Sequence, residues 1–368
     1  MSPVEPPRRV LVVGAGMIGT SIGLRLRSRG HELYLDDRDS GHLETAIRLG
    51  AGRPLTGEHV ELAVLAVPPG AVVEVVSDLV RRNLCDSITD TSSVKSHSQN
   101  EIEILSVQSS SSRLHSPAAA EIFTGGHPIA GRERSGPGAA RPDLFEGRVW
   151  VLTPSQRSRP EAIEAARWLV GACGATAIEM TPEEHDRALA ATSHVPQFVA
   201  SALAAQFAEL PDSHVRLAGP GLRDMTRIAE SDPDLWVDIA QANAGPLAAA
   251  LDQVSARLAS AAAELRRGKA SGGLRDLLEA GRAGRRRLPD KHGGSPRVYG
   301  AVAVIVSDEP GQLARLLADA GAAGINIEDL RVDHSPGLPV GIVELLVRPE
   351  SVAGLSAGLA QRGWPIED

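Results

Sequence analysis

The sequence predicts an α/β protein built of three parts. These are a Rossmann-like dinucleotide-binding domain over residues 1–180, an all-α domain for dimerisation and substrate binding over 181–290, and a ferredoxin-like domain over 297–368. In the first part, short β-branched runs alternate with amphipathic helical stretches. The pattern of the second part is almost entirely helical. In the third part, strand-like and helical segments alternate again. A chain of 368 residues is long enough for two or three such domains.

The first part carries strand-like runs separated by helical stretches, which is the pattern of a parallel sheet covered by helices. The predicted strands are Val10–Val13, Glu32–Leu35, Leu62–Val67, Ser87–Thr89, Val149–Leu152 and Thr176–Glu179. Between the fourth and fifth runs, residues 106–120 include the four serines Ser109–Ser112 and predict a mobile surface loop.

A glycine-rich loop follows the first predicted strand. Gly14, Gly16 and Gly19 form a GxGxxG pattern, with Met17 and Ile18 before the last glycine. The first glycine permits a tight turn, the second lets the backbone approach a pyrophosphate, and the third allows close packing of helix on strand. Because a strand precedes the loop and a helix follows it, we predict that these residues bind a dinucleotide. The alternative is a glycine-rich turn without a cofactor.

Acidic residues at the end of the second predicted strand indicate which dinucleotide binds. Asp36 or Asp37 would hydrogen-bond the ribose hydroxyls and repel a 2′-phosphate, so the sequence favours NAD over NADP, with Asp37 as the candidate. Arg38 follows directly and offers a 2′-phosphate a partner. We expect Val67 and Pro68 beside the nicotinamide-side ribose; alternatively, they simply end a strand.

The middle part is predicted to be helical. Thr181–Glu184 begins it well, because Thr is a good N-cap, Pro suits the first helical position and Glu at the third completes a capping box. Ala/Leu-rich stretches at residues 199–210 and 247–265 predict further helices, and we expect Pro196 and Pro246 to kink or break them. An Ala-rich zone of this size, low in aromatic residues, predicts a homodimer interface.

A linker rich in Arg, Gly and Pro is predicted over residues 282–297. Beyond it the order is strand, helix, strand, strand, helix, strand, as in ferredoxin-like domains. The first five of these elements are predicted at Val298–Val306, Gln312–Ala323, Ile325–Val332, Val340–Val347 and Ser351–Gln361.

The composition is that of a folded soluble protein, 42% hydrophobic and 23% charged. A net charge of −8 disfavours nucleic-acid binding. Cys85 and Cys173 form no CxxC pair, which argues against a disulfide framework and a cysteine zinc site. No stretch approaches the roughly 20 apolar residues of a membrane helix, and residues 1–9 lack the apolar core of a signal peptide. We expect a cytoplasmic protein without membrane or metal partners.

The segment Gly125–Gly131 holds the candidate catalytic residue, His127. Glycines and a proline predict irregular backbone, where reactive side chains are commonly presented. A neutral imidazole can take, or hydrogen-bond, the proton that hydride abstraction leaves on a hydroxyl. A loop histidine is more often a surface or structural residue, but the dinucleotide loop favours the catalytic interpretation.

Two further segments are candidates for the site. Ser93 and Lys95 follow the fourth predicted strand and should face the nicotinamide, since ligands bind beyond the carboxyl ends of parallel strands. The alternative for Ser92 or Ser93 is a helix cap. Arg223 and Arg227 would share one helix face.

Arginine binds carboxylates bidentately, so Arg227, oriented by Asp224, indicates an anionic substrate; an exposed ion pair is the alternative. Trp236 is expected to pack in the core or to line the pocket. His185 and His194 lie nine residues apart, on opposite faces of a continuous helix, and core or capping roles are expected for them.

Taken together, several segments resemble the prephenate/arogenate dehydrogenases, the TyrA family. The match runs from residue 8 to about residue 290, and a C-terminal part resembles an ACT domain. The family segments are Gly14–Gly19, Ser92–Lys95, Gly125–Gly131, Glu184–Asp186, Ser193–Pro196 and Asp224–Trp236, and the ACT segments are Asp308–Leu313 and Gly324–Ile327.

The resemblance implies oxidative decarboxylation of prephenate in tyrosine biosynthesis. NAD takes a hydride from the ring carbon that bears the hydroxyl, and the ring carboxylate leaves as CO2. The resemblance also implies that His127 polarises the ring hydroxyl and that Ser93 forms a hydrogen bond beside it. Arg227 binds the ring carboxylate, Glu133 lies near the entrance and Trp236 lines the pocket. The ACT resemblance implies control by L-tyrosine; a structural or dimerising appendage is the alternative.

One departure concerns the substrate. The family motif Ser-His-Leu-Pro-His places a second histidine near the substrate side chain, where this chain has Gln197. A neutral amide can accept from an ammonium as well as donate to a carboxylate. Arogenate, which carries an amino acid in place of the pyruvyl group, is therefore an alternative substrate. A dehydrogenase of another hydroxy acid and a non-catalytic sensor of NAD and an amino acid are the competing functions.

Overall fold

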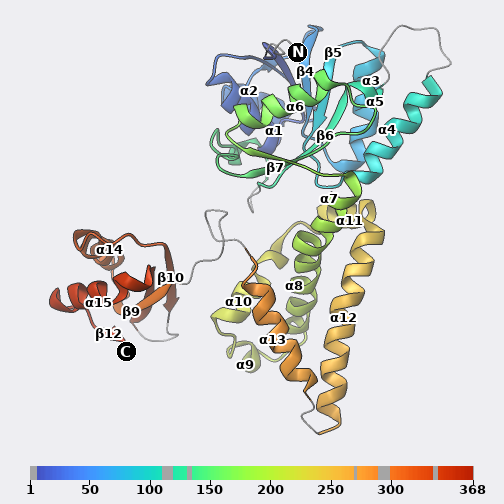
Figure 1. Cartoon of the computed structure of the whole chain (residues 1–368). Coiled ribbons are helices and arrows are strands. Elements are labelled where there is room, and N and C mark those ends of the chain that lie inside the picture. The colour runs from blue at the N-terminus through green and yellow to red at the C-terminus, as the bar shows by residue number, and fades with distance from the viewer. Residues whose placement is uncertain are drawn as a thin grey trace. The chain divides into compact units, whose positions relative to one another are not determined.

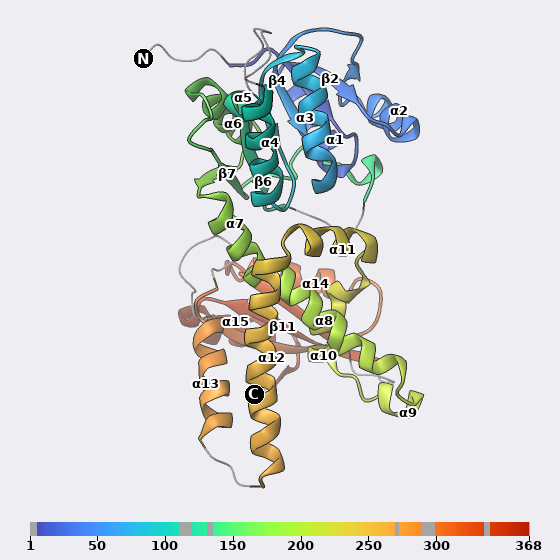
Figure 2. The same ribbon diagram turned by 90° about the vertical axis from the view of Figure 1, so that its right-hand side faces the viewer.

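The computed structural model describes residues 6–109, 119–130, 135–268, 272–288, 299–334 and 339–367. The chain divides into two compact units, each described here by itself (Figures 1 and 2). The first comprises Met1–Ala218 and Leu222–Ser255, and the second comprises Gly219–Gly221 and Ala256–Asp368. Glu133 and most of the predicted serine-rich loop lie outside the described residues. The ends of that loop are described, and the backbone N–H of Ala120 donates to Ser106 Oγ at 2.8 Å.

An eight-stranded sheet forms the centre of the first unit, in the order β3-β2-β1-β4-β5-β6-β7-β8. The first six of these strands pair in parallel, whereas β7 runs antiparallel to β6 and parallel to β8. The strands are β1 (Arg9–Val13), β2 (Glu32–Asp36), β3 (Arg53–Pro54), β4 (Val60–Leu65), β5 (Cys85–Asp90), β6 (Phe123–Pro128), β7 (Val149–Thr153) and β8 (Thr176–Glu179).

The predicted parallel sheet is confirmed through β5, and six predicted strands are present. Two strands were not predicted. β3 has only two residues, and β6 contains two glycines and a proline, which have low strand propensity. The prediction of irregular backbone around His127 is wrong, because His127 lies in β6, hydrogen-bonded between β5 and β7.

Helices cover both faces of the sheet and enclose two apolar cores (Figure 1). One face is covered by α1 (Met17–Arg27), α2 (Ser40–Arg48) and α6 (Pro160–Ala172). The other is covered by α3 (Val72–Arg81), α4 (Ser96–Ser109) and α5 (Ala119–Ile122). The central strands β1 and β4 are buried on both faces, as a doubly covered parallel sheet requires. This leaves the carboxyl ends of the strands as the accessible edge.

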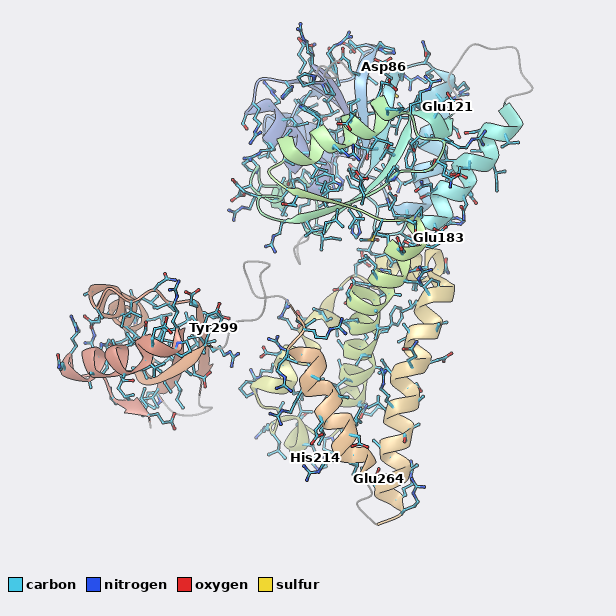
Figure 3. All side chains as sticks on the ribbon, in the orientation of Figure 1. Asp86, Glu121, Glu183, His214, Glu264 and Tyr299 are labelled. Carbon is cyan, nitrogen blue, oxygen red and sulfur yellow. The ribbon has the colours of Figure 1, made fainter. Side chains whose placement is uncertain are left out.

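The helical part begins at α7 (Pro182–Leu189) as predicted. Thr181 Oγ1 accepts from Glu184 N at 3.2 Å, and a Glu184 carboxylate oxygen accepts from Thr181 N at 3.0 Å, which completes the capping box. Glu183 adds a carboxylate to the same first turn (Figure 3), where its negative charge interacts favourably with the positive end of the helix dipole.

A π-helical turn, Ala190–His194, joins α7 to α8 (Val195–Ala205) without breaking the helical path. Pro196 lies just after this π-helical turn and has no N–H to donate to it, so the helix departs from regular α geometry there, as expected, without ending. Pro246 lies in the first turn of α12, where proline costs no internal hydrogen bond. The following elements are α9 (Asp212–Val215), α10 (Pro220–Thr226), the short turn η5 (Arg227–Glu230), α11 (Pro233–Ala242), α12 (Ala244–Arg266) and α13 (Gly273–Arg285). The predicted linker is wrong at its start, because residues 282–285 belong to α13.

A four-stranded antiparallel sheet, in the order β10-β11-β9-β12, forms the C-terminal part of the second unit. The element order predicted from the sequence is present, and the apolar core includes Val304, Leu345 and Leu355. The elements are β9 (Gly300–Ser307), α14 (Gln312–Ala322), β10 (Asp329–His334), β11 (Val340–Val347), α15 (Val352–Gln361) and β12 (Ile366–Glu367).

Candidate active site

The glycine loop between β1 and α1 has the geometry that a dinucleotide needs. Gly14 has φ +98°, and a Cβ there or at Gly19 would collide with backbone oxygens of Ala66 or Gly14. Gly16 has an ordinary φ of −72°, and a Cβ there would meet no atom within 4 Å. The first and third glycines are thus required by the fold. Gly16 instead leaves open space at the start of α1, where a phosphate would meet backbone N–H groups.

Asp37 is the carboxylate that faces this loop. Its Oδ2 accepts from the backbone N–H of Ala15 at 2.5 Å, and its Oδ1 accepts from Asp39 N at 2.8 Å. Asp36 contributes its backbone carbonyl to Gly14 N at 2.8 Å, while its side chain is exposed. Asp37 is therefore held beside the loop, which suits its predicted contact with the ribose hydroxyls.

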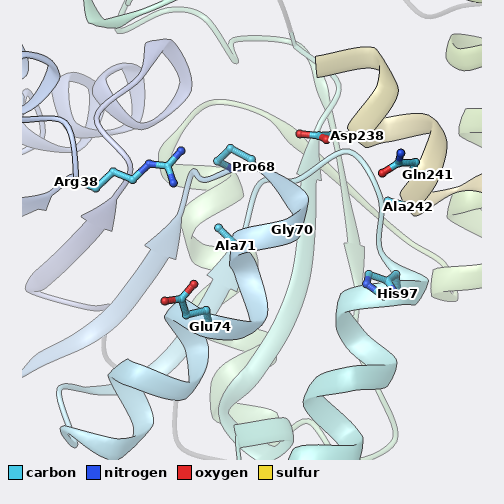
Figure 4. Close-up of a pocket in the computed structure, with 9 residues that line it drawn as sticks. All are labelled: Arg38, Pro68, Gly70, Ala71, Glu74, His97, Asp238, Gln241 and Ala242. Carbon is cyan, nitrogen blue, oxygen red and sulfur yellow. The ribbon is translucent and has the colours of Figure 1, made fainter. Parts of the chain in front are cut away.

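A pocket of about 500 Å³ opens beside the strand ends (Figure 4). Arg38 and Pro68, both predicted for the cofactor, line it, together with the turn η1 (Pro69–Ala71) and the start of α3. α11 packs against η1 and supplies the opposite wall. The lining residues are Arg38, Pro68, Gly70, Ala71, Glu74, His97, Asp238, Gln241 and Ala242. These features fit a dinucleotide that runs from Asp37 past Pro68.

A buried polar network joins β5 to β6 directly beneath His127. Lys95 Nζ contacts the Asp90 carboxylate, and it donates to Ser92 Oγ at 2.9 Å and to the Gly126 carbonyl at 2.7 Å. Asp90 Oδ1 in turn accepts from Gly126 N at 2.9 Å. Asp90 and Lys95 are almost completely buried. The expectation that Lys95 faces the nicotinamide is therefore wrong. Its ammonium is buried and binds Asp90, Ser92 and the Gly126 carbonyl, and so it holds the strand that carries His127 in place.

The two glycines before His127 are needed for close packing rather than for an unusual backbone angle. A Cβ on Gly125 would collide with Thr153 Oγ1, and one on Gly126 would lie 2.7 Å from the Asp90 carbonyl oxygen. Neither glycine has a positive φ. They let β6 lie close to its neighbours and so fix where His127 sits.

His127 heads a chain of three side chains that leads from β6 into α7. Its Nδ1 lies 2.9 Å from His185 Nε2, and His185 Nδ1 lies 2.8 Å from Asp186 Oδ1. Asp186 is an acceptor, so His185 donates from Nδ1 and accepts at Nε2. His127 must then donate from Nδ1. Its Nε2 carries the lone pair and forms no hydrogen bond with any described residue.

Asp186 has a second task at the start of α4. Its two oxygens accept from the backbone N–H groups of Lys95 and Ser96, at 2.9 and 2.8 Å. Burial raises the pKa of this carboxyl, but the hydrogen bonds from His185 and Ser96 outweigh that effect and hold the pKa below its usual value. Asp186 is thus an anion near neutral pH, which fixes the orientation of His185.

The pKa of His127 lies well below that of a free histidine. Burial is the largest cause, and the neighbouring His185 and Lys95 lower it further. The imidazole is therefore neutral at pH 7 and available as a hydrogen-bond acceptor.

His194 and Asn243 extend the cluster on the helical side. Asn243 Nδ2 donates to the Asp186 carbonyl at 2.9 Å and lies 3.2 Å from His194 Nδ1, and the Trp236 ring stands edge-on to His194 at 5.9 Å between centroids. His185 and His194 are both buried, which agrees with the expected core role, but the expectation that they point to opposite faces of a continuous helix is wrong. The π-helical turn changes the helical phase between them, and both join the network around Asp186.

The remaining predicted residues are placed as follows. Ser93 is half-buried beyond β5 and forms no hydrogen bond within the described parts of the chain, whereas Ser92 belongs to the buried network. Gln197 is buried on α8, and its Nε2 donates to Ser201 Oγ at 3.4 Å.

Arg227 begins η5, which packs on α8, so it does not continue the α10 helix of Arg223 and Asp224. The expectation that Arg223 and Arg227 share one helix face is therefore wrong. The functional roles of Ser93, Gln197, Arg227, Trp236 and Asp224 stay predictions.

Asp90, His185, Asp186 and Asn243 were not singled out for the site from the sequence. His185 and Asp186 lie within the Glu184–Asp186 segment that carries the family resemblance, which was the available signal. Asn243 ends a helix and has no local signature. Its contact with Asp186 spans 57 residues and exists only in the fold.

Comparison with known proteins identifies the family. The model of the prephenate dehydrogenase nucleotide-binding domain matches residues 22–179, and that of the prephenate dehydrogenase dimerization domain matches residues 181–280. A relative from Streptomyces niveus, described as "Probable prephenate dehydrogenase NovF", is 34% identical over 97% of this chain and 99% of its own length. The chain belongs to the prephenate dehydrogenase family. The prephenate dehydrogenase of Bacillus subtilis is 28% identical over 88% of this chain and 87% of its own.

Solved structures agree with this assignment. The prephenate dehydrogenase from A. aeolicus, in complex with hydroxyphenyl propionate and NAD+, matches with a TM-score of 0.66 and 25% identity over 77% of this chain and 99% of its own. Synechocystis arogenate dehydrogenase matches with a TM-score of 0.61 and 25% identity over 76% of this chain and all of its own. The predicted family, its oxidoreductase class and its cofactor NAD are confirmed. Neither family model reaches the C-terminal sheet, so the ACT assignment stays a prediction.

Within the described ranges, no helix is long and apolar enough to cross a membrane. The same residues contain no group of three His, Cys, Asp or Glu side chains arranged to hold a metal ion.

Proposed function

We propose that this protein oxidises and decarboxylates prephenate to 4-hydroxyphenylpyruvate in tyrosine biosynthesis, with His127 as the group that acts on the ring hydroxyl. The observation that carries the proposal is the tautomer of His127. Its Nδ1 is committed to His185, and its Nε2 lone pair is left for a ligand at the edge of the sheet that holds the dinucleotide loop.

When bound, NAD accepts the hydride that leaves the ring carbon bearing the hydroxyl. As the hydride leaves with its electron pair, that hydroxyl donates a hydrogen bond to His127 Nε2, which stabilises the positive charge developing on the carbon. The bond from the ring to its carboxylate then breaks. CO2 departs, and the electrons of that bond complete the aromatic ring.

Three other side chains have proposed tasks. Ser93, free of hydrogen bonds within the described residues, would contact the same hydroxyl beside His127. Arg227 would hold the ring carboxylate in a bidentate pair before it leaves. Gln197 would lie at the substrate side chain, where a neutral amide accommodates either a pyruvyl group or an amino acid. Arogenate is therefore the alternative substrate, and a dual cyclohexadienyl dehydrogenase is included.

We propose a homodimer formed through the helical part. Residues 181–280 match a dimerization domain. Large apolar side chains are exposed there, including Met225, Val237, Leu258 and Leu278, each more than half exposed in the single chain. For the C-terminal sheet we propose an ACT domain that responds to L-tyrosine, on the basis of its element order and its sequence resemblance.

The test is a matrix of initial rates with prephenate and arogenate, each with NAD and NADP, with and without L-tyrosine. NAD-dependent release of CO2 from at least one of the two substrates is the expected result. Binding of NAD without turnover of either substrate would overturn the proposal and favour a non-catalytic sensor. Unchanged rates in the presence of L-tyrosine would overturn the effector assignment alone.

A further inference from the structure

Among the described residues, three charged side chains without a hydrogen bond or ion pair line the pocket, and they are Arg38, Glu74 and, on the opposite wall, Asp238. Arg38 follows β2 on one side, and Glu74 stands in the first turn of α3 on the other. Arg38 and Glu74 both carry exposed side chains, and neither forms a hydrogen bond or an ion pair with a described residue. Figure 4 shows the guanidinium of Arg38 and the carboxylate of Glu74 on the same side of η1.

The position of Arg38 poses a question of selectivity. It comes directly after Asp37, whose carboxylate is fixed at the glycine loop by Ala15 N and Asp39 N. The adenosine ribose of a dinucleotide binds beside this acid, so the 2′-substituent lies near the next residue along the chain. An unopposed arginine at that point attracts a 2′-phosphate, which would weaken the preference for NAD.

We propose that Glu74 is a specificity-determining residue that offsets Arg38 and so excludes NADP. The inference rests on the proposed function only in that the pocket takes a nicotinamide dinucleotide. With Glu74 present, the local charge of this pair is neutral and a 2′-phosphate gains no net attraction. With Glu74 neutralised, the attraction of Arg38 for the phosphate is opposed by one carboxylate fewer, although Asp37 still repels the phosphate. NAD, which has a 2′-hydroxyl, is little affected in either case.

The expected size follows from the charges involved. A 2′-phosphate carries up to two negative charges, and in this proposal it would share the pocket with the Glu74 carboxylate. At the effective dielectric of a solvent-exposed protein site, removing that repulsion should strengthen NADP binding by about tenfold. The gain should shrink at high salt, because both groups are exposed to solvent.

The experiment measures the dissociation constants of NAD+ and NADP+ by isothermal titration calorimetry on the full chain. The variants are E74Q, R38Q and the double variant E74Q/R38Q. E161Q is the matched control, because Glu161 is an exposed carboxylate in the first turn of α6, away from the pocket, and gives the same change in net charge. Thermal unfolding of each variant confirms that it is folded, and E74A repeats the test if E74Q is not.

The expected result is that E74Q strengthens NADP+ binding about tenfold with NAD+ binding nearly unchanged, and that the double variant loses this gain. E161Q should behave as the unmodified chain. An unchanged ratio of the two dissociation constants in E74Q and E74A would overturn the proposal, as would a gain that persists without Arg38. If the unmodified chain binds neither dinucleotide, the proposed function itself fails, which is a distinct outcome.

Discussion

The rings of His127 and His185 meet edge to face, with Nδ1 of the first 2.9 Å from Nε2 of the second and the ring planes 73° apart. One imidazole therefore sets the tautomer of the other, and Asp186 sets the tautomer of His185 in turn. The side chains of His185 and Asp186 on α7 thus fix the ring of His127 on β6, so that the lone pair on His127 Nε2 has a fixed direction. The same carboxylate accepts hydrogen bonds at the start of α4, so the orientation of His127, the proposed catalytic group, is coupled to the local fold through Asp186.

Replacing Asp186 by Asn should lower kcat at least tenfold and leave the KM for substrate nearly unchanged. The amide no longer fixes His185 as a donor at Nδ1, so a fraction of the molecules hold His127 with its lone pair turned inward. Steady-state kinetics on the folded variant measure the effect. H127N is the reference, with an expected loss of about 10² to 10⁴ in kcat and unchanged NAD affinity. A D186N enzyme with normal kcat would remove the relay from the mechanism.

The low pKa of His127 predicts the acid side of the pH profile. Burial, His185 and Lys95 all disfavour the imidazolium, so the lone pair stays available down to pH values well below 6.5. We expect log kcat to be flat from about pH 8 to below 6.5 and then to fall with a slope of one as His127 gains a proton. Rates measured in buffers of constant ionic strength test this. A midpoint at or above pH 6.5 would contradict the assignment of that limb to His127.

Two glycine-to-alanine changes should separate the fold from the cofactor. At Gly126 an added Cβ lies 2.7 Å from the Asp90 carbonyl, so backbone must shift, and we expect G126A to lose about 1–3 kcal/mol of unfolding free energy. At Gly16 the φ of −72° suits alanine and the added methyl meets no protein atom. G16A should therefore keep its thermal midpoint but bind NAD at least tenfold more weakly, because the methyl occupies the approach of the pyrophosphate. The pair is checked by thermal unfolding and calorimetric titration. The reverse pattern would show that Gly126 is not a packing glycine.

The sequence supported the prediction of the parts of the fold that depend on local pattern. The apolar runs of β1 and β4, the capping box at Thr181 and the glycine loop all have signals within a few residues. The strand that carries His127 was missed because its glycines serve neighbours that are distant in sequence, Asp90 and Thr153, rather than the local backbone. The direction of Lys95 was missed for a related reason. Its partner Asp90 lies five residues away, but the second acceptor, the Gly126 carbonyl, is supplied by β6.

Substrate choice is predicted to depend on Gln197. This side chain is buried on α8 and its amide donates only weakly, at 3.4 Å, to Ser201 Oγ, so it remains available to a ligand. Replacing it by His should favour the pyruvyl side chain of prephenate, to which a ring N–H donates, and disfavour the ammonium of arogenate. We expect kcat/KM for prephenate relative to arogenate to rise about tenfold in Q197H. S201A is the control, since it removes the protein partner of the amide without changing the group that meets the substrate. An unchanged ratio in Q197H would place the discriminating contact elsewhere in the helical part.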